Sequence, residues 1–173
     1  MDSTEANYEI RQAIMTVHDR GANLRLIQET GRRFSVTIIC FDAEMLAGRE
    51  HADTAIQHAW RSIISQKPIS NSFEMEALLF AAGSRQCSVA ASFGIHEGEN
   101  KMFVCLSPPH EEAWKVLSHH MRFVPETWED LSHQKVARLI SLFGITQHEL
   151  ETVGHSQLKD LILERIALLE VCR

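Results

Sequence analysis

The stretch that most constrains the fold is ISNSFEMEALLFAAGSRQ, from Ile69 to Gln86. Its middle is apolar on every side, and only Glu74 and Glu76 interrupt it. This pattern predicts a helix that is buried all round, with both glutamates in the first turn, where the helix dipole favours negative charge. Asn71 stands three residues before Glu74, which is the spacing of a capping box. Gly83 is a natural end for the helix, although the alternation in FEMEA also permits a strand.

The segments around this helix alternate between strand and helix patterns. Alternation predicts a strand at 8–17, and β-branched and aromatic residues predict another at 34–41. Further strands are expected at 102–107 and 122–125, and helices at 21–33, 52–63, 87–94, 110–121, 132–144, 145–153 and 156–171, the last capped by Ser156. We therefore predict a mixed α/β (α+β) fold, with a small sheet of about four strands covered by helices. We expect the 173 residues to form one domain, with a mixed body at 1–125 and a helical part at 126–173.

The composition excludes several classes of protein. The chain has no apolar run long enough to cross a membrane. Its acidic, polar start is unlike a secretory signal, so we expect a cytoplasmic protein. The formal net charge of −6 argues against a broad, sequence-independent grip on nucleic acid, which needs a basic surface. A small local RNA site is compatible with this charge.

Cysteines and histidines give little support to a metal site. Cys40, Cys87 and Cys105 lie in apolar runs without a CxxC pair, and we expect them to be small buried hydrophobic residues. His51 and His58 share one side of a helix but are separated by about 10.5 Å of helical rise, too far to bind one zinc ion together. We predict neither a metal site nor a cofactor.

An enzyme is the rival class. The sequence lacks a nucleophile elbow and a phosphate-binding glycine loop. His110 and Glu111, with a histidine such as His119, are the acid–base candidates. The alternative interpretation is that Glu111 belongs to the charged first turn of a helix. We expect no small-molecule substrate and no catalytic residue, and a plain protein-interaction module is a third possibility.

The last helix has two apolar sides. On a helical wheel one side is a broad stripe that we predict to be core, made of Leu158, Leu161, Ile162, Leu168 and Leu169. The second side carries Leu163, Ile166 and Ala167, with Lys159 and Glu170 among them. One stripe is enough to dock a terminal helix on its own domain, so we predict that the second side meets a partner and is partly exposed in the free chain. The alternative is that the chain folds around both sides.

Several strings together resemble one family. ISNS, an apolar helix containing glutamate, and AGSRQ are similar to the small kinase-binding subunit of the KEOPS (EKC) complex, in its archaeal-type form. GREHADTAIQHAW, SFGIHEG and LKDLILERIALLEV add to the resemblance, which runs from about Phe34 to Val171. SHHMRFVPETWEDLSH matches the family less closely, and the first eight residues do not align.

The resemblance implies a non-catalytic subunit. Its complex installs threonylcarbamoyladenosine beside the anticodon of certain tRNAs, and the subunit binds a small atypical kinase that acts as an ATPase and supports its activity. Archaeal members also hold the single-stranded 3′ CCA tail of tRNA. Single-stranded RNA is bound by backbone groups, amides and guanidinium groups. The residues that match these needs lie at the two ends of the buried helix: Asn71, Ser72, Gly83, Ser84, Arg85 and Gln86.

Overall fold

The fold is built on one antiparallel sheet. The computed structural model describes residues 4–172, and its four strands are arranged in the order β2-β3-β1-β4. The strands are β1 (Glu9–Val17), β2 (Thr37–Asp42), β3 (Gly98–Ser107) and β4 (Arg122–Phe123). β3 pairs with β1 on one side and with β2 on the other. The predicted mixed α+β class is confirmed, and β2 forms one edge of the sheet.

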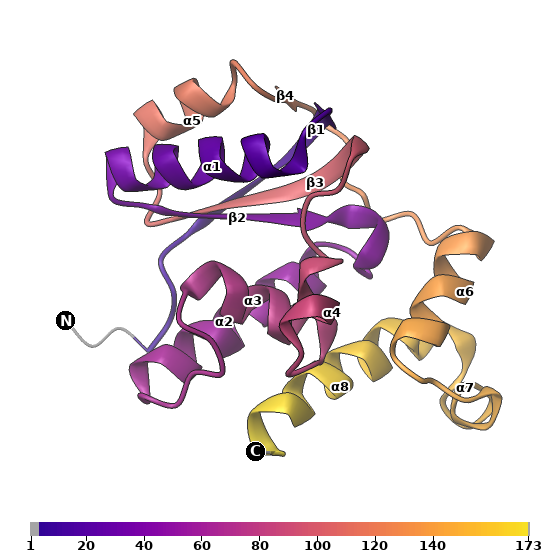
Figure 1. The fold of residues 1–173 in the computed structure, drawn as a ribbon. Coiled ribbons are helices and arrows are strands. Elements are labelled where there is room, and N and C mark those ends of the chain that lie inside the picture. The colour runs from indigo at the N-terminus through magenta and orange to yellow at the C-terminus, as the bar shows by residue number, and fades with distance from the viewer. Residues whose placement is uncertain (1–3, 173) are drawn as a thin grey trace.

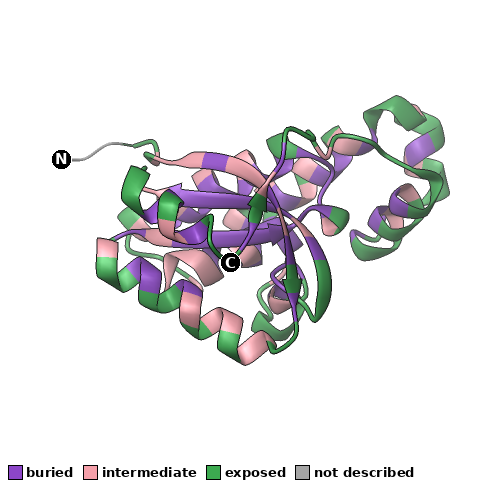
Figure 2. Ribbon diagram, turned by 90° about the horizontal axis from the view of Figure 1, so that it is seen from above, coloured by how far each residue is buried: buried purple, intermediate pink, exposed green. Residues whose placement is uncertain are grey.

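Helices cover both faces of this sheet (Figure 1). One face carries α1 (Arg20–Phe34) and α5 (Glu111–Leu117). The other face carries α2 (Arg49–Ile64), α3 (Phe73–Ala82), α4 (Cys87–Ala91) and α8 (Leu158–Val171). The remaining elements are η1 (Ala43–Met45), α6 (His133–Leu142), α7 (Gln147–Val153) and η2 (His155–Gln157). Figure 2 shows that the central strands are buried, whereas the segment with α6 and α7 is largely exposed.

The sheet separates two hydrophobic cores. Ile38 and Cys40 of β2 belong to the core under α1 and α5, while Ile39 and Phe41 belong to the core shared with α3. This alternation follows from the two-residue period of a strand. Cys40 and Cys105 are buried, as expected, and burial raises the pKa of both thiols. The expectation for Cys87 was wrong, because this residue opens α4 on the side that faces solvent.

The buried helix of the opening stretch is α3. Its ends are close to those predicted, but Ser72 rather than Asn71 is the N-cap, and the Ser72 Oγ accepts from the Met75 N–H at 3.3 Å. Asn71 is exposed. Gly83 ends the helix in the left-handed conformation, at φ 59°. Burial is less uniform than predicted, because Met75 and other residues on one side of α3 are only partly covered.

Glu76 has a different role from the predicted one. It is fully buried, and its carboxylate accepts hydrogen bonds from the backbone N–H of Ile69 at 3.0 Å and of Ser70 at 2.8 Å. The hydroxyls of Ser62 and Ser70 also donate to it, at 2.6 and 2.9 Å. A buried carboxylate is tolerable when several donors replace its water. Glu76 therefore holds the segment before α3 in place, rather than merely complementing a helix dipole.

His51 ties the other end of α3 to α2. Its Nδ1 accepts from the Ala47 N–H at 3.0 Å, and its Nε2 donates to the Ala81 carbonyl at 2.8 Å. Burial lowers the pKa of His51 to about 4, so the ring is neutral near pH 7. The residue uses both ring nitrogens inside the fold.

The start of α8 differs from the prediction. α8 begins after Gln157 without a side-chain cap, so the prediction that Ser156 caps this helix was wrong. Within residues 4–172, no helix has the length and apolar character needed to cross a bilayer.

Replacing Glu76 tests its role as an anchor. Glu76→Ala should lower the free energy of unfolding by about 3 kcal/mol or more, because it leaves several buried donors without an acceptor. Chemical denaturation measures this loss. Glu74→Ala is the matched control on the same turn, since the Glu74 carboxylate has no partner among the described residues and should cost under about 1 kcal/mol. Equal losses for the two variants would refute the anchor.

Candidate functional site

The C-terminal helix α8 docks on the domain through one side. Leu158, Leu161, Ile162 and Leu169 are buried, which confirms four of the five predicted core positions. The fifth, Leu168, is 44% exposed, so that prediction was wrong. α8 lies against α2 and α3 and its C-terminal end projects below α4 (Figure 1). The large apolar side chains that α8 exposes, Leu168 and Val171, therefore lie in its last turns.

The predicted partner side of α8 needs one correction. Ile166 is completely buried, because it follows Ile162 by four residues and so lies only about 40° further round the helix. Leu163 and Ala167 are partly exposed, as expected. Lys159, also on this side, lies 3.4 Å from the carboxylate of Glu129.

Glu170 fastens the exposed end of α8 to α2. Its carboxylate accepts a hydrogen bond from Nδ1 of His58, and the Arg61 guanidinium lies 3.6 Å from the same oxygen. Burial lowers the pKa of His58, and the hydrogen bond to Glu170 opposes that shift. Glu170 is thus engaged within the chain, and it fixes the position of the helix end.

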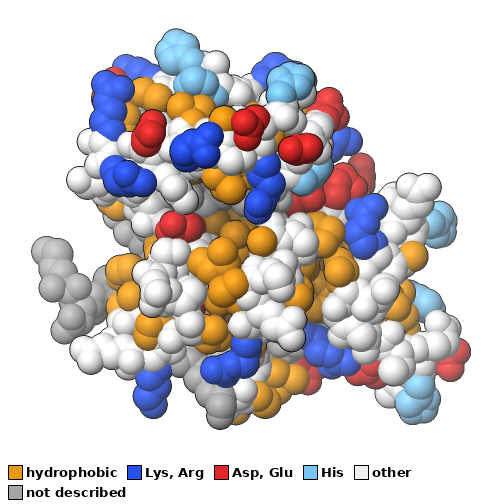
Figure 3. All heavy atoms as spheres, viewed as in Figure 1, with side chains coloured by type: hydrophobic (Ala, Val, Ile, Leu, Met, Phe, Trp, Pro, Cys, Tyr) orange, Lys and Arg blue, Asp and Glu red, His pale blue; other side chains and the backbone are white. Residues whose placement is uncertain are grey.

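An apolar surface surrounds this end of α8. Leu142 of α6, Leu168 and Val171 are 39%, 44% and 78% exposed. Leu142 and Leu168 line a shallow hollow of about 250 Å³ together with Gly83, Phe143, Arg165 and Cys172. Figure 3 shows a small group of hydrophobic side chains at the lower edge of the molecule and a larger group in the middle of the face, between the α1 layer and the helices below it. We call Leu142, Leu168, Val171 and the hollow beside them the α8 surface.

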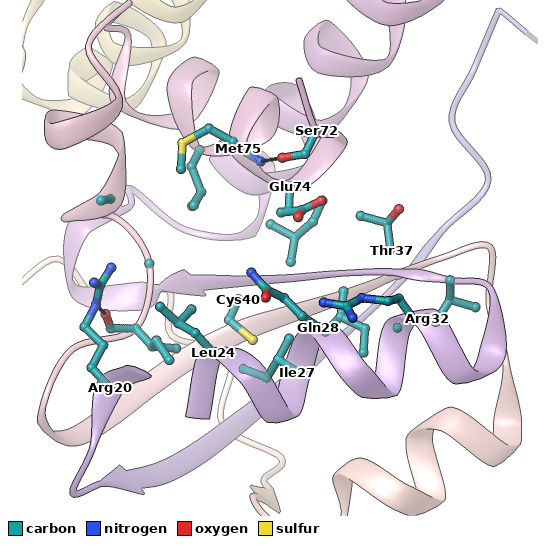
Figure 4. A pocket seen from close by; sticks show the side chains of 18 of the residues that line it. Arg20, Leu24, Ile27, Gln28, Arg32, Thr37, Cys40, Ser72, Glu74 and Met75 are labelled. Carbon is teal, nitrogen blue, oxygen red and sulfur yellow. Dashed lines mark hydrogen bonds between the residues drawn. The ribbon is translucent and has the colours of Figure 1, made fainter. Parts of the chain in front are cut away.

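The opposite end of α3 opens on a second hollow. This hollow has a volume of about 680 Å³ and lies along the outer edge of β2, between α1 on one side and the start of α3 and α4 on the other. Figure 4 shows Leu24, Ile27 and Gln28 of α1 below the strand, and Ser72 and Met75 of α3 above it. We call it the β2 groove. It is the larger of these two hollows.

The six predicted RNA-binding residues lie at the two ends of α3. Ser72 lines the β2 groove, whereas Gly83 lines the hollow of the α8 surface. The ten residues of α3 separate these ends by about 15 Å. Ser84 follows Gly83 and accepts the Gln86 N–H through its hydroxyl, while Arg85 is exposed. The structure therefore does not bring the two groups into one small site.

The rival acid–base residues do not converge in a cleft. His110 caps α5, and its Nδ1 accepts from the Ala113 N–H at 3.3 Å. Glu111 is exposed and lies 3.4 Å from the Arg11 guanidinium. Neither residue lines the β2 groove or the α8 surface, and the same holds for His119, which is exposed beyond the end of α5. Within residues 4–172, no three His, Cys, Asp or Glu side chains are grouped to hold a metal ion.

A comparison with protein-family models identifies the family. The model for the kinase binding protein CGI-121 matches residues 7–170, nearly the whole chain. The chain therefore belongs to the CGI-121 family of kinase-binding proteins. A comparison with curated proteins finds no matching relative. A kinase partner is thus supported, and binding rather than catalysis is the role that the family description suggests.

Proposed function

We propose that the chain is a non-catalytic subunit of a KEOPS-like complex that makes threonylcarbamoyladenosine in tRNA. In this proposal it binds and activates the small atypical kinase of the complex, an ATPase, and holds the 3′ CCA tail of the tRNA. The proposal rests on the family, whose members are described as kinase-binding, and on the exposed apolar end of α8. It places the protein in the cytoplasm.

The α8 surface has the features of a partner site. Leucine and valine side chains are exposed next to one another there, although a free chain gains nothing from exposing them. Below them Ile166 and Leu169 are buried, and Glu170 is tied to His58, so the helix is already held in the geometry that a partner would meet. A rigid apolar patch binds at a lower entropic cost than a mobile one.

A charge on the α8 surface, or beside it at Ala167, should break the kinase complex. Leu168→Glu and Ala167→Glu should leave the melting temperature of the free chain nearly unchanged, because both side chains are at least partly exposed. Binding of the kinase should weaken about 100-fold or more, since an unpaired charge would be buried in the interface. Size-exclusion co-elution and the ATPase rate of the kinase measure this.

Val153→Glu is the matched control for this experiment. Val153 is 43% exposed, nearly the same as Leu168, but it lies at the end of α7 and does not line the hollow of the α8 surface. Kinase binding should survive in the control. Unchanged binding by Leu168→Glu would show that the kinase binds elsewhere, and a melted Leu168→Glu chain would show that the side chain supports the core.

The turn between α3 and α4 is the proposed contact for the tRNA tail. Arg85 and Gln86 are exposed in this turn, and their side chains have no hydrogen-bond partner among the described residues. Ser84 and Gly83 bring backbone groups to the same place, which suits close approach by a single strand. Because the ends of α3 are about 15 Å apart, Asn71 and Ser72 are left to the far end of a trinucleotide that spans the helix.

Arg85→Glu should weaken the binding of tRNA with an intact CCA end to the complex of this chain and its kinase. Removing the tail from the tRNA should weaken the unmodified complex to a similar extent. The salt dependence should be shallow, with a slope of about −2 or less steep, because the tail offers few phosphates. Filter binding measures all three. Arg25→Glu, which changes an exposed arginine on α1, is the control, and identical binding of intact and shortened tRNA would contradict the assignment.

A further inference from the structure

The outer edge of β2 carries backbone groups that are left without partners. β2 pairs only with β3, so every second residue turns its N–H and C=O away from the sheet. The Asp42 N–H points outward, since it donates to the Phe93 carbonyl at 2.7 Å, and the Val36 N–H donates outward to Gly31 at 2.9 Å. By alternation, Ile38 and Cys40 between them also turn their backbone groups outward.

These outward groups face the β2 groove. Ile38 and Cys40 both line it, and both residues are more than nine-tenths buried. Within residues 4–172 the outward N–H groups of Ile38 and Cys40 make no hydrogen bond. The outward N–H groups of Val36 and Asp42, on either side of them, are both hydrogen-bonded within the chain. Buried backbone groups are almost always paired. Unpaired backbone N–H and C=O groups at the floor of a groove can form hydrogen bonds with an added strand.

The walls of the groove specify the side chains of such a strand. Because side chains of a strand alternate, an added strand would direct one set toward α1 and the other toward α3. Leu24 and Ile27 present apolar groups on the α1 side, and Met75 and Leu78 do so on the α3 side. A strand covered on both faces is apolar along its length. The β2 groove, at about 680 Å³, is large enough for a few residues of an extended peptide.

The arginines at the rim of the β2 groove favour one further feature in the bound strand. Arg20 and Arg32 lie toward opposite ends of the α1 side of the groove (Figure 4). The Arg20 guanidinium donates to the Ile95 carbonyl, but the Arg32 guanidinium forms no hydrogen bond or ion pair with any residue in 4–172. An acidic side chain on the α1 side of the bound strand would pair with Arg32.

We propose that the β2 groove binds an extended peptide segment of a partner protein, which adds antiparallel to β2 as a fifth strand. The segment is apolar on both faces and carries a carboxylate near Arg32. Its residues opposite Ile38 and Cys40 exchange N–H···O=C bonds with them and point their side chains toward α1. This site is separate from the α8 surface, so it gives the chain a second protein contact, and Ser72 is the residue of the proposed tRNA-tail site that also lines it.

A synthetic peptide tests the backbone bonds directly. The probe is the labelled hexapeptide Ser-Ile-Val-Glu-Val-Ser, blocked at both ends, in which Ile and Glu share the face directed toward α1 and Glu lies opposite Ile38, at the Arg32 end of the groove. Methylating the backbone nitrogen of Ile removes an N–H that faces β2, and should weaken binding about tenfold or more. Methylating the nitrogen of the following Val, whose N–H points away from β2, should change binding less than about threefold. Fluorescence polarisation measures both peptides.

Amide exchange locates the peptide on the chain. In NMR hydrogen-exchange spectra of the free protein, the outward N–H groups of Ile38 and Cys40 should exchange faster than those of Ile39 and Phe41, which bond to β3. Adding the peptide should slow exchange at Ile38 and Cys40. Arg32→Glu should weaken binding about threefold or more and favour a peptide with Lys in place of Glu, while the neighbouring Arg33→Glu, whose guanidinium lies over Phe34, should not.

Three outcomes would overturn the proposal. The first is that the peptide does not bind, and the second is that it binds with equal affinity whichever nitrogen is methylated. The third is that the trinucleotide CCA, and not the peptide, protects Ile38 and Cys40, which would make the groove a site for nucleobases. The peptide experiments test the β2 groove, whereas kinase co-elution of Leu168→Glu tests the proposed function. Failure of one proposal can therefore be distinguished from failure of the other.

Discussion

The buried carboxylate of Glu76 is the interaction on which the arrangement of the lower layer depends. It gathers the N–H groups of Ile69 and Ser70 and the hydroxyl of Ser62, and so joins the end of α2, the following segment and the first turn of α3. Without Glu76, the partly buried N–H groups of Ile69 and Ser70 would lack this acceptor, at a cost of about 1–3 kcal/mol apiece, whereas the Ser62 hydroxyl keeps the Lys67 carbonyl at 3.1 Å. At the far end of α3, His51 makes the corresponding link to α2. The helix is held at both ends, and the rest of the layer packs around it.

Holding α3 in this way separates two surfaces. Its first turn forms one wall of the β2 groove, and its last residue borders the hollow of the α8 surface. A partner on one surface leaves the other open, about 15 Å away along the helix. A kinase-binding protein built this way can contact its kinase through α8 while presenting the α3–α4 turn and the sheet edge to other molecules. The fold is therefore suited to joining partners, and the histidines and carboxylates of α5 form no shared cleft.

Much of the fold could be predicted because it depends on local periodicity. The strand at β2 follows from its β-branched and aromatic residues, α3 from a run that is apolar on every side, and α8 from its apolar stripe. Errors arose where neighbours in space decide the outcome. Ile166 was assigned to the partner side although it lies closer to Ile162 than to Leu163 around the helix, and Leu168 was assigned to the core although no element covers it fully. Glu76 had the position of an ordinary first-turn glutamate, and only the packing of the preceding segment reveals its donors. The unpaired edge of β2 could not be predicted, because one sequence does not reveal the order of strands in a sheet.

The central claim is that the C-terminal end of α8, and not the sheet edge, is where the kinase binds. Hydrogen–deuterium exchange of the free chain and of its complex with the small kinase, followed by mass spectrometry, tests this claim in one measurement. The account predicts slower exchange in peptides that cover residues 164–172, with unchanged exchange in peptides that cover 36–42. Protection of 36–42 without protection of the end of α8 would contradict it, and would place the kinase in the β2 groove.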